Sequence, residues 1–284
     1  MFAITGVTGQ VGGIVATQLL QAGLPVRAIL RNAEKGKAWR EKGAELALAE
    51  MTDADALTAA FTGAEGVFLL IPPTFDPTPG FPEVGAVIAA LKTALLRTRP
   101  ERVVCLSTIG AQAEEPNLLS QLGLVEQELS TLPLPIAFLR AAWFMENAAW
   151  DVAAAREAGV IASFLQPLDQ AYPMVSVADV GERAASLLRE SWTGKRIVEL
   201  QGPEKVTPAD IAAAFSKVLS KPVSAEVVAR DSWEALFKGQ GMRNPTPRIR
   251  MIDGFNEGWI CFEGQPEKGS TTLETAIRRL VEAA

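Results

Sequence analysis

The sequence predicts an α/β protein, built as a doubly wound parallel sheet with a smaller C-terminal subdomain. Short apolar runs rich in β-branched residues alternate with amphipathic segments through residues 1–140, and the alternation loosens afterwards. The spacing leaves a helix-length crossover between successive strands, and right-handed crossovers place strands parallel with helices on both faces. With 284 residues, 48% of them hydrophobic, the chain is long enough to bury such a core.

Six strands are expected in the first half, each an apolar run bounded by turn residues. They are Phe2–Thr5, Pro25–Leu30, Ala44–Leu48, Gly66–Ile71, Arg102–Ser107 and Ile136–Arg140. Between them, apolar residues recur with helical periodicity, which predicts crossover helices. These helices are Val11–Gln21, Glu34–Lys42, Asp53–Phe61, Glu83–Arg97 and Asn117–Leu129.

The second half predicts fewer strands and a long irregular stretch. Short strands are expected at Val175, Ile197–Leu200 and Val223–Val228, and helices at Val177–Arg189, Pro208–Leu219 and Thr272–Ala283. Residues 239–269 are rich in Gly, Pro and Asn, which predicts loops. We therefore divide the chain into a sheet domain, residues 1–150, and a substrate-facing cap, residues 151–284, packed on it.

The first strand runs into a glycine-patterned turn that opens the first helix. The turn has the spacing Gly-x-x-Gly-x-x-Gly, and Thr8 stands where the pattern Gly-x-Gly-x-x-Gly has its middle glycine. Such a turn lets the backbone approach a pyrophosphate, and the helix N-terminus adds free N–H groups and a positive dipole end. We therefore expect a Rossmann-type NAD(P)-binding domain; an ordinary βα turn is the alternative. The cofactor-binding residues predicted here are Gly6, Thr8, Gly9, Gln10, Val11 and Gly12.

The residue after the second strand is Arg31, where NAD-specific sites carry an acid for the ribose 2′-hydroxyl. A guanidinium instead grips a 2′-phosphate through parallel charge-assisted hydrogen bonds. Lys35 and Lys37 follow and add positive charge. We predict NADP(H) as the cofactor, with a solvated basic helix start as the alternative.

Two further strand ends contribute candidate cofactor residues. Asp53 follows the third strand and can cap the next helix, contact the adenine amino group, or do both. Ile71 and Pro72 end the fourth strand, near where the middle of the cofactor would pass, and a Pro-rich loop with Phe75 follows.

The fifth and sixth strand ends face the expected nicotinamide position. Ser107 either presents its hydroxyl there or satisfies backbone groups in a turn. Trp143 and Phe144 either wall the nicotinamide or belong to the core beneath the cap. Glu126 and Arg140 are expected to form a structural ion pair, so we assign no catalytic residue.

Composition excludes several classes of function. The chain has no histidine, which removes the usual metal ligand and the usual general acid–base residue, so we expect no metal site. The net charge of −6 argues against nucleic acid or an anionic membrane as a partner. Only two cysteines are present, and Cys105 lies in an apolar strand pattern, which is typical of a reduced protein. With a strand starting at residue 2, we expect no signal peptide and a cytoplasmic location.

Five features in chain order resemble the NmrA-like branch of the atypical short-chain dehydrogenase/reductases. They are the turn Gly6–Gly12, Arg31-Asn32, Leu106-Ser107-Thr108, Val125-Glu126 with Leu139-Arg140 and Phe144-Met145-Glu146-Asn147, and Val175–Gly181. The resemblance implies a Rossmann domain and a preference for NADP(H). It also implies similarity either to reductases of quinones, triphenylmethane dyes or imines, or to regulators that bind the dinucleotide without turnover.

The chain departs from the catalytic pattern of ordinary short-chain dehydrogenases, which use a Tyr-x-x-x-Lys pair to move a proton. The only tyrosine is Tyr172, and Ser176 stands four residues on. Leu122 occupies a position where many NmrA-like members carry lysine. The departure favours hydride transfer to an electrophile that needs little proton assistance, such as a quinone, iminium or cationic dye.

Two kinds of partner are compatible with these features. A reductase would take a small apolar or aromatic substrate, and its chain could form a homodimer. The alternative is a non-catalytic NADP(H) sensor that acts through a protein partner. Arg243, Arg248 and Arg250 in the irregular stretch are left without a role.

Overall fold

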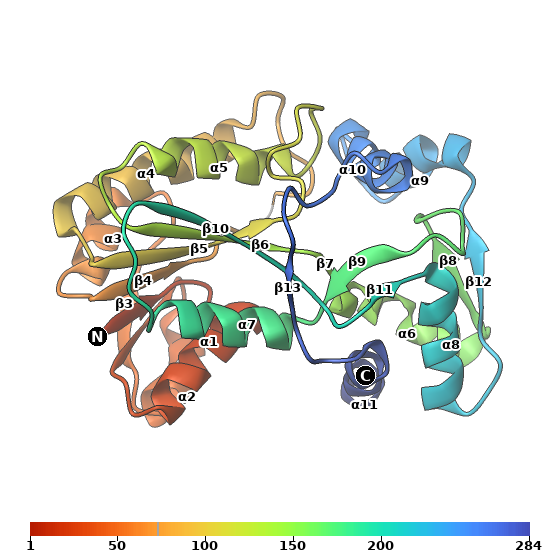
Figure 1. Cartoon of the computed structure of the whole chain (residues 1–284), viewed down its shortest axis with the longest axis horizontal. Helices are drawn as coiled ribbons and strands as arrows, with labels where there is room; N and C mark the ends of the chain where they lie inside the picture. The colour runs from red at the N-terminus through yellow and green to blue at the C-terminus, as the bar shows by residue number, and fades with distance from the viewer. Residues whose placement is uncertain (73) are drawn as a thin grey trace.

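A single large parallel sheet lies between two layers of helices in the left half of the molecule as drawn in Figure 1. The computed structural model describes residues 1–72 and 74–284. Eight strands lie in the order β13-β10-β6-β5-β4-β1-β2-β3, and every pair runs parallel. Their bounds are Phe2–Ile4 (β1), Val26–Leu30 (β2), Glu45–Leu48 (β3), Gly66–Leu69 (β4), Arg102–Thr108 (β5), Ile136–Ala141 (β6), Lys195–Gln201 (β10) and Glu267–Lys268 (β13). The predicted α/β fold with a doubly wound sheet is confirmed.

Helices cover both faces of this sheet, and each face has its own apolar core (Figure 1). One core lies under α1 (Gln10–Gln21) and α7 (Val177–Leu187), and the other under α3 (Ala54–Phe61), α4 (Pro82–Thr98) and α5 (Ser120–Ser130). Gly181 allows α7 to pack closely on α1, because a Cβ there would lie 2.5 Å from Cγ2 of Ile14. Between β2 and β3 the chain forms only a 3-10 turn, Ala33–Gly36, and the short α2, Lys37–Glu41.

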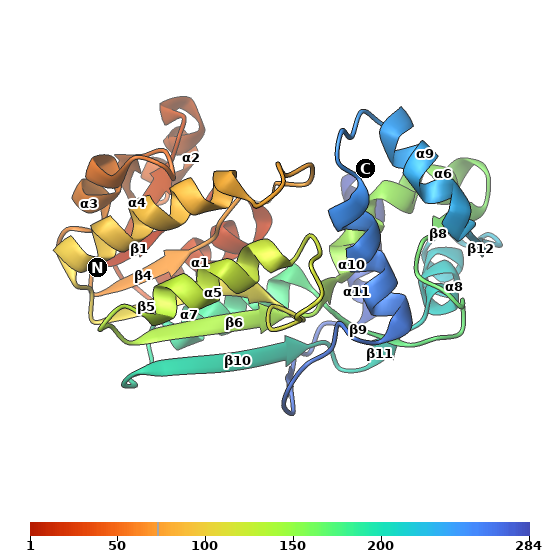
Figure 2. The ribbon, with the colours of Figure 1, turned by 90° about the horizontal axis from the view of Figure 1, so that it is seen from above.

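The C-terminal part of the chain builds two small sheets and five helices beside the carboxyl ends of the large sheet (Figure 2). The strands are Trp143–Phe144 (β7), Val160–Ser163 (β8), Tyr172–Val175 (β9), Lys205–Val206 (β11) and Ser224–Val227 (β12). The helices are Val152–Glu157 (α6), Pro208–Leu219 (α8), Trp233–Gly239 (α9), Thr246–Glu257 (α10) and Leu273–Ala283 (α11), with 3-10 turns at Met145–Asp151 and Arg230–Ser232. The capping box of Thr207 and Asp210 fixes the start of α8.

Two features of the second half differ from the sequence expectation. The stretch 239–269 holds the regular helix α10, so the expectation of an irregular stretch was wrong for residues 246–257. Residues beyond 150 also return to the large sheet as β10 and β13, and α7 covers one of its faces. A single boundary at residue 150 therefore does not separate the large sheet from the C-terminal region, because the chain crosses between them several times.

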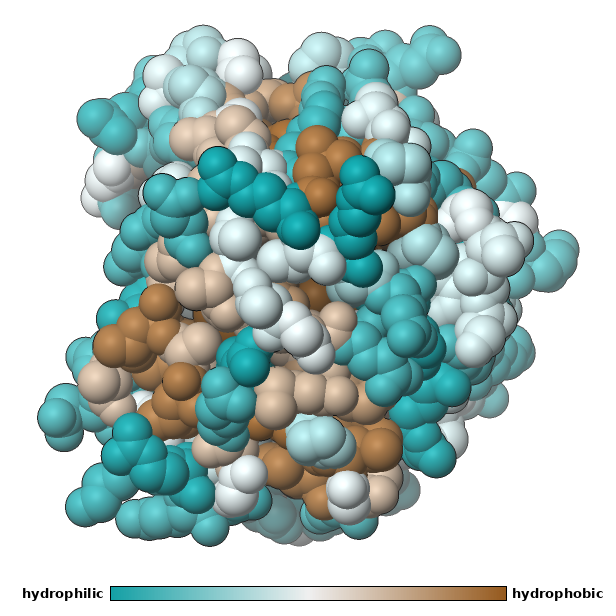
Figure 3. Space-filling view, turned by 90° about the vertical axis from the view of Figure 1, so that its left-hand side faces the viewer, coloured by the Kyte–Doolittle hydropathy of each residue, from teal (hydrophilic) through white to brown (hydrophobic). Residues whose placement is uncertain are grey.

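The amino ends of the strands face away from the C-terminal region. On that side, hydrophobic and hydrophilic side chains are intermingled at the surface (Figure 3). In the described part of the chain, no helix combines the length and the apolar character that crossing a membrane requires.

Candidate functional site

In the turn between β1 and α1, the backbone conformation at Gly6 and the close packing at Gly12 both favour glycine, and the space at Gly9 is open. Gly6 has φ of +68°, in the left-handed region that favours glycine. A Cβ on Gly12 would lie 2.3 Å from the carbonyl oxygen of Gly6, so only glycine lets the helix lie this close to the strand. A Cβ on Gly9 would meet only that same carbonyl oxygen, at 3.4 Å, so the space above Gly9 is open.

The N-terminus of α1 is free to receive an anion. Gly9 is the N-cap with extended backbone, and within the described residues no side chain caps the first turn. Thr8, Gly9 and Gln10 are exposed, whereas the side chain of Val11 is buried, so Val11 offers only its backbone N–H. Open space together with uncapped N–H groups fits a pyrophosphate. A groove of about 470 Å³ begins beside this turn, between α1, Trp39 of α2 and Ala178 of α7.

Arg31 lies directly after β2 and is exposed. It makes no ion pair with any residue of the described chain, so its guanidinium is available to a ligand. Asn32 is used locally, since its side chain accepts a hydrogen bond from the N–H of Glu34. Lys35 and Lys37 are exposed nearby, and the 2′-phosphate role of Arg31 stays a prediction.

Asp53 caps α3, as one of its two predicted roles required. Its carboxylate accepts hydrogen bonds from the N–H groups of Asp55 at 3.1 Å and Ala56 at 2.9 Å. The adenine contact stays a prediction.

The residues that follow β4 differ in burial. Pro72 is exposed, Ile71 packs against the core under α3–α5, and Pro73 lies outside the described residues.

The loop after β4 is attached on both sides. The hydroxyl of Thr5 on β1 accepts a hydrogen bond from the N–H of Leu70, which fixes where the loop begins. The carboxylate of Asp76 accepts hydrogen bonds from the N–H groups of Arg243 and Asn244, and these bonds hold its pKa below the usual range. The loop therefore joins the carboxyl edge of the sheet to the segment before α10.

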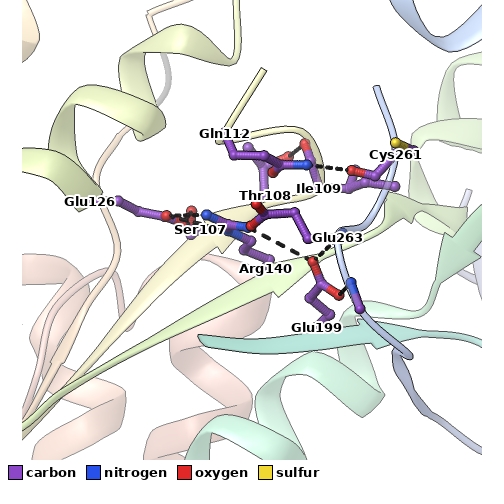
Figure 4. A network of polar contacts seen from close by, with 10 residues as sticks. Ser107, Thr108, Ile109, Gln112, Glu126, Arg140, Glu199, Cys261 and Glu263 are labelled. Carbon is purple, nitrogen blue, oxygen red and sulfur yellow. Dashed lines mark hydrogen bonds and ion pairs between the residues drawn. The ribbon is translucent and has the colours of Figure 1, made fainter. Parts of the chain in front are cut away.

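Ser107 does not satisfy backbone groups in a turn, and its contact with a nicotinamide stays a prediction. It is buried, and its hydroxyl donates a hydrogen bond to the carboxylate of Glu126 on α5 (Figure 4). Sequence reasoning missed this contact because residues of β5 and α5 meet only when the helix packs on the sheet.

Arg140 at the centre of the same network forms the predicted ion pair. Its Nη2 lies 2.7 Å and its Nε 3.0 Å from the two carboxylate oxygens of Glu126, and both side chains are buried. Nη1 donates to Glu263 and lies 3.8 Å from Glu199 on β10 (Figure 4). Burial by itself would lower the pKa of Arg140, but its hydrogen bonds and charge interactions with Glu126 and Glu263 raise it above the usual range.

Trp143 and Phe144 on β7 are half-buried and point to different cores. Trp143 packs edge-on against Phe255 of α10, with ring centroids 5.1 Å apart, in the C-terminal core. Phe144 packs against the core under α1 and α7. Both residues serve the core role that the sequence left open, and their contact with a nicotinamide stays a prediction.

A residue that sequence reasoning quoted only within a motif, Glu146, proves to hold two elements together. Its carboxylate accepts hydrogen bonds from the hydroxyl of Ser176 and from the N–H of Val177, the first residue of α7. Ser176 in turn caps Ala178. The sequence did contain the two parts of this contact: Glu146 shortly after the sixth strand, and Ser176-Val177-Ala178 at the start of a helix.

Known proteins resemble this chain in both sequence and fold. The profile of the NmrA-like family matches residues 1–244. A (4-alkanoyl-5-oxo-2,5-dihydrofuran-3-yl)methyl phosphate reductase of Streptomyces griseus is 31% identical over 236 residues, which cover 82% of this chain and 78% of the relative. An NAD(P)H azoreductase of Xenophilus azovorans is 26% identical over 259 residues, or 90% of this chain and 85% of the relative. A solved structure of an NADPH-dependent quinone oxidoreductase from Escherichia coli, complexed with NADPH, is 25% identical, with a TM-score of 0.80 and 99% of each chain covered.

Proposed function

The chain belongs to the NmrA-like family, and we propose that it is an NADPH-dependent reductase of an electrophilic acceptor. The acceptor class is a quinone, an iminium compound or a cationic dye. The observation that carries the proposal is the glycine turn at the carboxyl edge of a parallel sheet, where no side chain of the described residues caps the N-terminus of α1. Two of the similar proteins support it, since one is named an NAD(P)H azoreductase and the other an NADPH-dependent quinone oxidoreductase.

The cofactor is NADP(H), and when bound its nicotinamide supplies the hydride. The N–H groups of Gln10, Val11 and Gly12 would hold the pyrophosphate, helped by the dipole of α1. The guanidinium of Arg31 would hold the 2′-phosphate. Residues 1–150 carry these contacts, and the part of residues 151–284 that lies outside α7, β10 and β13 supplies the cap that faces the acceptor.

The hydroxyl groups of Tyr172 and Ser107 are unsuited to donating a proton to the acceptor. Tyr172 is 2% exposed, its hydroxyl donates to the carbonyl of Gln166, and burial raises its pKa to about 12. The Ser107 hydroxyl already donates to Glu126. An iminium or cationic dye is neutralised by hydride alone, and a quinone takes its proton from water, so these acceptors need no protein acid.

The test is loss of NADPH absorbance with quinones, iminium compounds and cationic dyes, with NADH as the comparison cofactor. Turnover of one acceptor class with a preference for NADPH is the expected result. Tight NADPH binding without turnover across the panel would overturn the reductase and favour the NADP(H) sensor that acts through a protein partner.

A further inference from the structure

A short segment of the C-terminal region, Ile260–Gly264, crosses the carboxyl ends of β5, β6 and β10 (Figure 4). We call this segment the strap. It has no helix or strand structure of its own, so side chains from the sheet hold it in place.

Polar side chains on or just after β5, β6 and β10 hold three of the five residues of the strap, namely Cys261, Glu263 and Gly264. Gln112, which follows β5, donates from Nε2 to the carbonyl of Cys261 at 2.8 Å. Arg140 of β6 donates to the carboxylate of Glu263. Glu199 of β10 accepts hydrogen bonds from the N–H of Glu263 at 2.9 Å and of Gly264 at 2.8 Å.

Apolar contacts place the strap between two cores. Ile260 is buried, and it lies so close to the turn after β5 that a Cβ on Gly110 would meet it at 2.8 Å. Phe262 packs against both the core under α1 and α7 and the C-terminal core that contains Trp143. The strap thus lies at the junction between the sheet and the region assigned to the acceptor.

One guanidinium serves both the strap and the interior of the sheet. The Nε–Nη2 edge of Arg140 is occupied by Glu126, which also accepts the Ser107 hydroxyl, and its Nη1 holds Glu263. A planar guanidinium with fixed donors cannot turn toward one partner without leaving the other. The position of the strap and the orientation of Ser107 are therefore coupled through Arg140 and Glu126.

We propose that Arg140 is a positioning residue that keeps the strap closed over the acceptor side of the site. Hydride transfer requires the donor ring and the acceptor to be held within about 3–3.5 Å, so a strap that opens more often lowers the fraction of chains able to bind the acceptor productively. The kinetic part of this inference rests on the proposed function, whereas the structural part does not.

The test compares Glu263→Gln with Glu267→Gln in the full-length chain. Glu263 is 55% exposed, so Glu263→Gln folds, keeps the side-chain shape and removes the charge that faces Arg140. Glu267 lies four residues on, is 45% exposed and pairs with Arg183, so it is the matched control. Arg140→Lys is the second variant, because it retains the positive charge and loses the planar guanidinium that binds Glu126 and Glu263 together.

Amide hydrogen exchange of a peptide spanning residues 260–264 is the first readout. Without cofactor, we expect exchange about tenfold faster in Glu263→Gln and in Arg140→Lys, and unchanged in Glu267→Gln. Unchanged exchange in both strap variants would overturn the positioning role, whether or not the chain turns over any acceptor.

Steady-state kinetics is the second readout. We expect Glu263→Gln to raise the KM for the acceptor about three- to tenfold while leaving the Kd for NADPH unchanged. Faster exchange with an unaltered acceptor KM would overturn closure over the acceptor side. Failure of the wild-type chain to turn over any acceptor would instead count against the proposed function, and the exchange result would still decide the role of Arg140.

Discussion

The N-termini of α1 and α7 lie beside the same groove, but a carboxylate of the chain itself binds only at the start of α7. Gly9 and Gln10 line that groove from α1, and Ala178 lines it from α7. The start of α7 is filled by the chain itself, because Ser176 caps it and Glu146 accepts the N–H of Val177. The start of α1 has no side-chain cap in the described chain and is preceded by exposed residues.

This difference separates a structural helix end from a binding one. Each helix begins with N–H groups that lack intrahelical partners and a positive dipole end. At α7 an internal carboxylate meets that requirement and stabilises the fold. At α1 the requirement is left to a ligand, which supports binding of the cofactor pyrophosphate there.

Filling the open space at α1 should have the largest effect on cofactor binding. Gly9→Val places a branched side chain where the pyrophosphate is expected, and we predict a Kd for NADPH raised by at least about a hundredfold. Fluorescence titration measures the Kd, and Gly85→Val, at an exposed glycine of α4 with open space around it, is the control. An unchanged Kd would mean that the cofactor binds elsewhere.

Removing the internal anion at α7 should affect stability and spare cofactor affinity. Glu146→Ala leaves the buried Ser176 hydroxyl and the Val177 N–H without their partner, at a cost of about 1–3 kcal/mol. Urea denaturation reports the free energy of unfolding, with the exposed Glu226→Ala as control. A loss of NADPH affinity with no loss of stability would reverse the roles assigned to the two helix ends.

Charge reversal beside the α1 site should discriminate between the two dinucleotides. We predict that Arg31→Glu weakens NADPH about ten- to thirtyfold and NADH much less, because only NADPH carries the 2′-phosphate. Arg189→Glu, at another exposed arginine, controls for the change in net charge. Equal losses for both cofactors would contradict the 2′-phosphate assignment.

The start of a third helix, α6, extends the comparison, because its contribution to stability should depend on pH. Asp151 is the N-cap of α6 but makes no capping hydrogen bond, and burial raises its pKa to about 6 from the ordinary value of 3.8. The folded state thus holds the proton more tightly, so the stability from this group is complete below the ordinary pKa and is lost as pH rises toward 6. At neutral pH, Asp151→Asn should therefore raise the free energy of unfolding on the order of 1 kcal/mol.

The measurement is urea denaturation of both chains at several pH values on either side of this window. The difference between them should shrink as pH falls. A difference that does not depend on pH would show that folding does not raise the pKa of Asp151.

Local sequence patterns predicted several of the contacts around the candidate site. Asp53 caps its helix as expected, since the cap depends only on residues two and three positions away. The Glu126–Arg140 pair is also confirmed, because a helix and the strand that follows it pack together in this fold. The sequence also contained indications of α10, namely Pro247 in its first turn and Gly258, with φ of +85°, at its end. The high content of Gly, Pro and Asn in the surrounding stretch made this helix easy to miss.

The sequence by itself determined the strand–helix order, the glycine turn and the absence of a Tyr-x-x-x-Lys pair, because each depends on neighbouring residues. Only the tertiary structure decided that Glu146 fills the start of α7, that Ser107 donates to Glu126 and that Arg140 holds the strap. Arg140 and Glu263 are separated by 123 positions in the chain. No local periodicity encodes such a contact; it forms because the folded sheet brings the carboxyl ends of its strands to one edge.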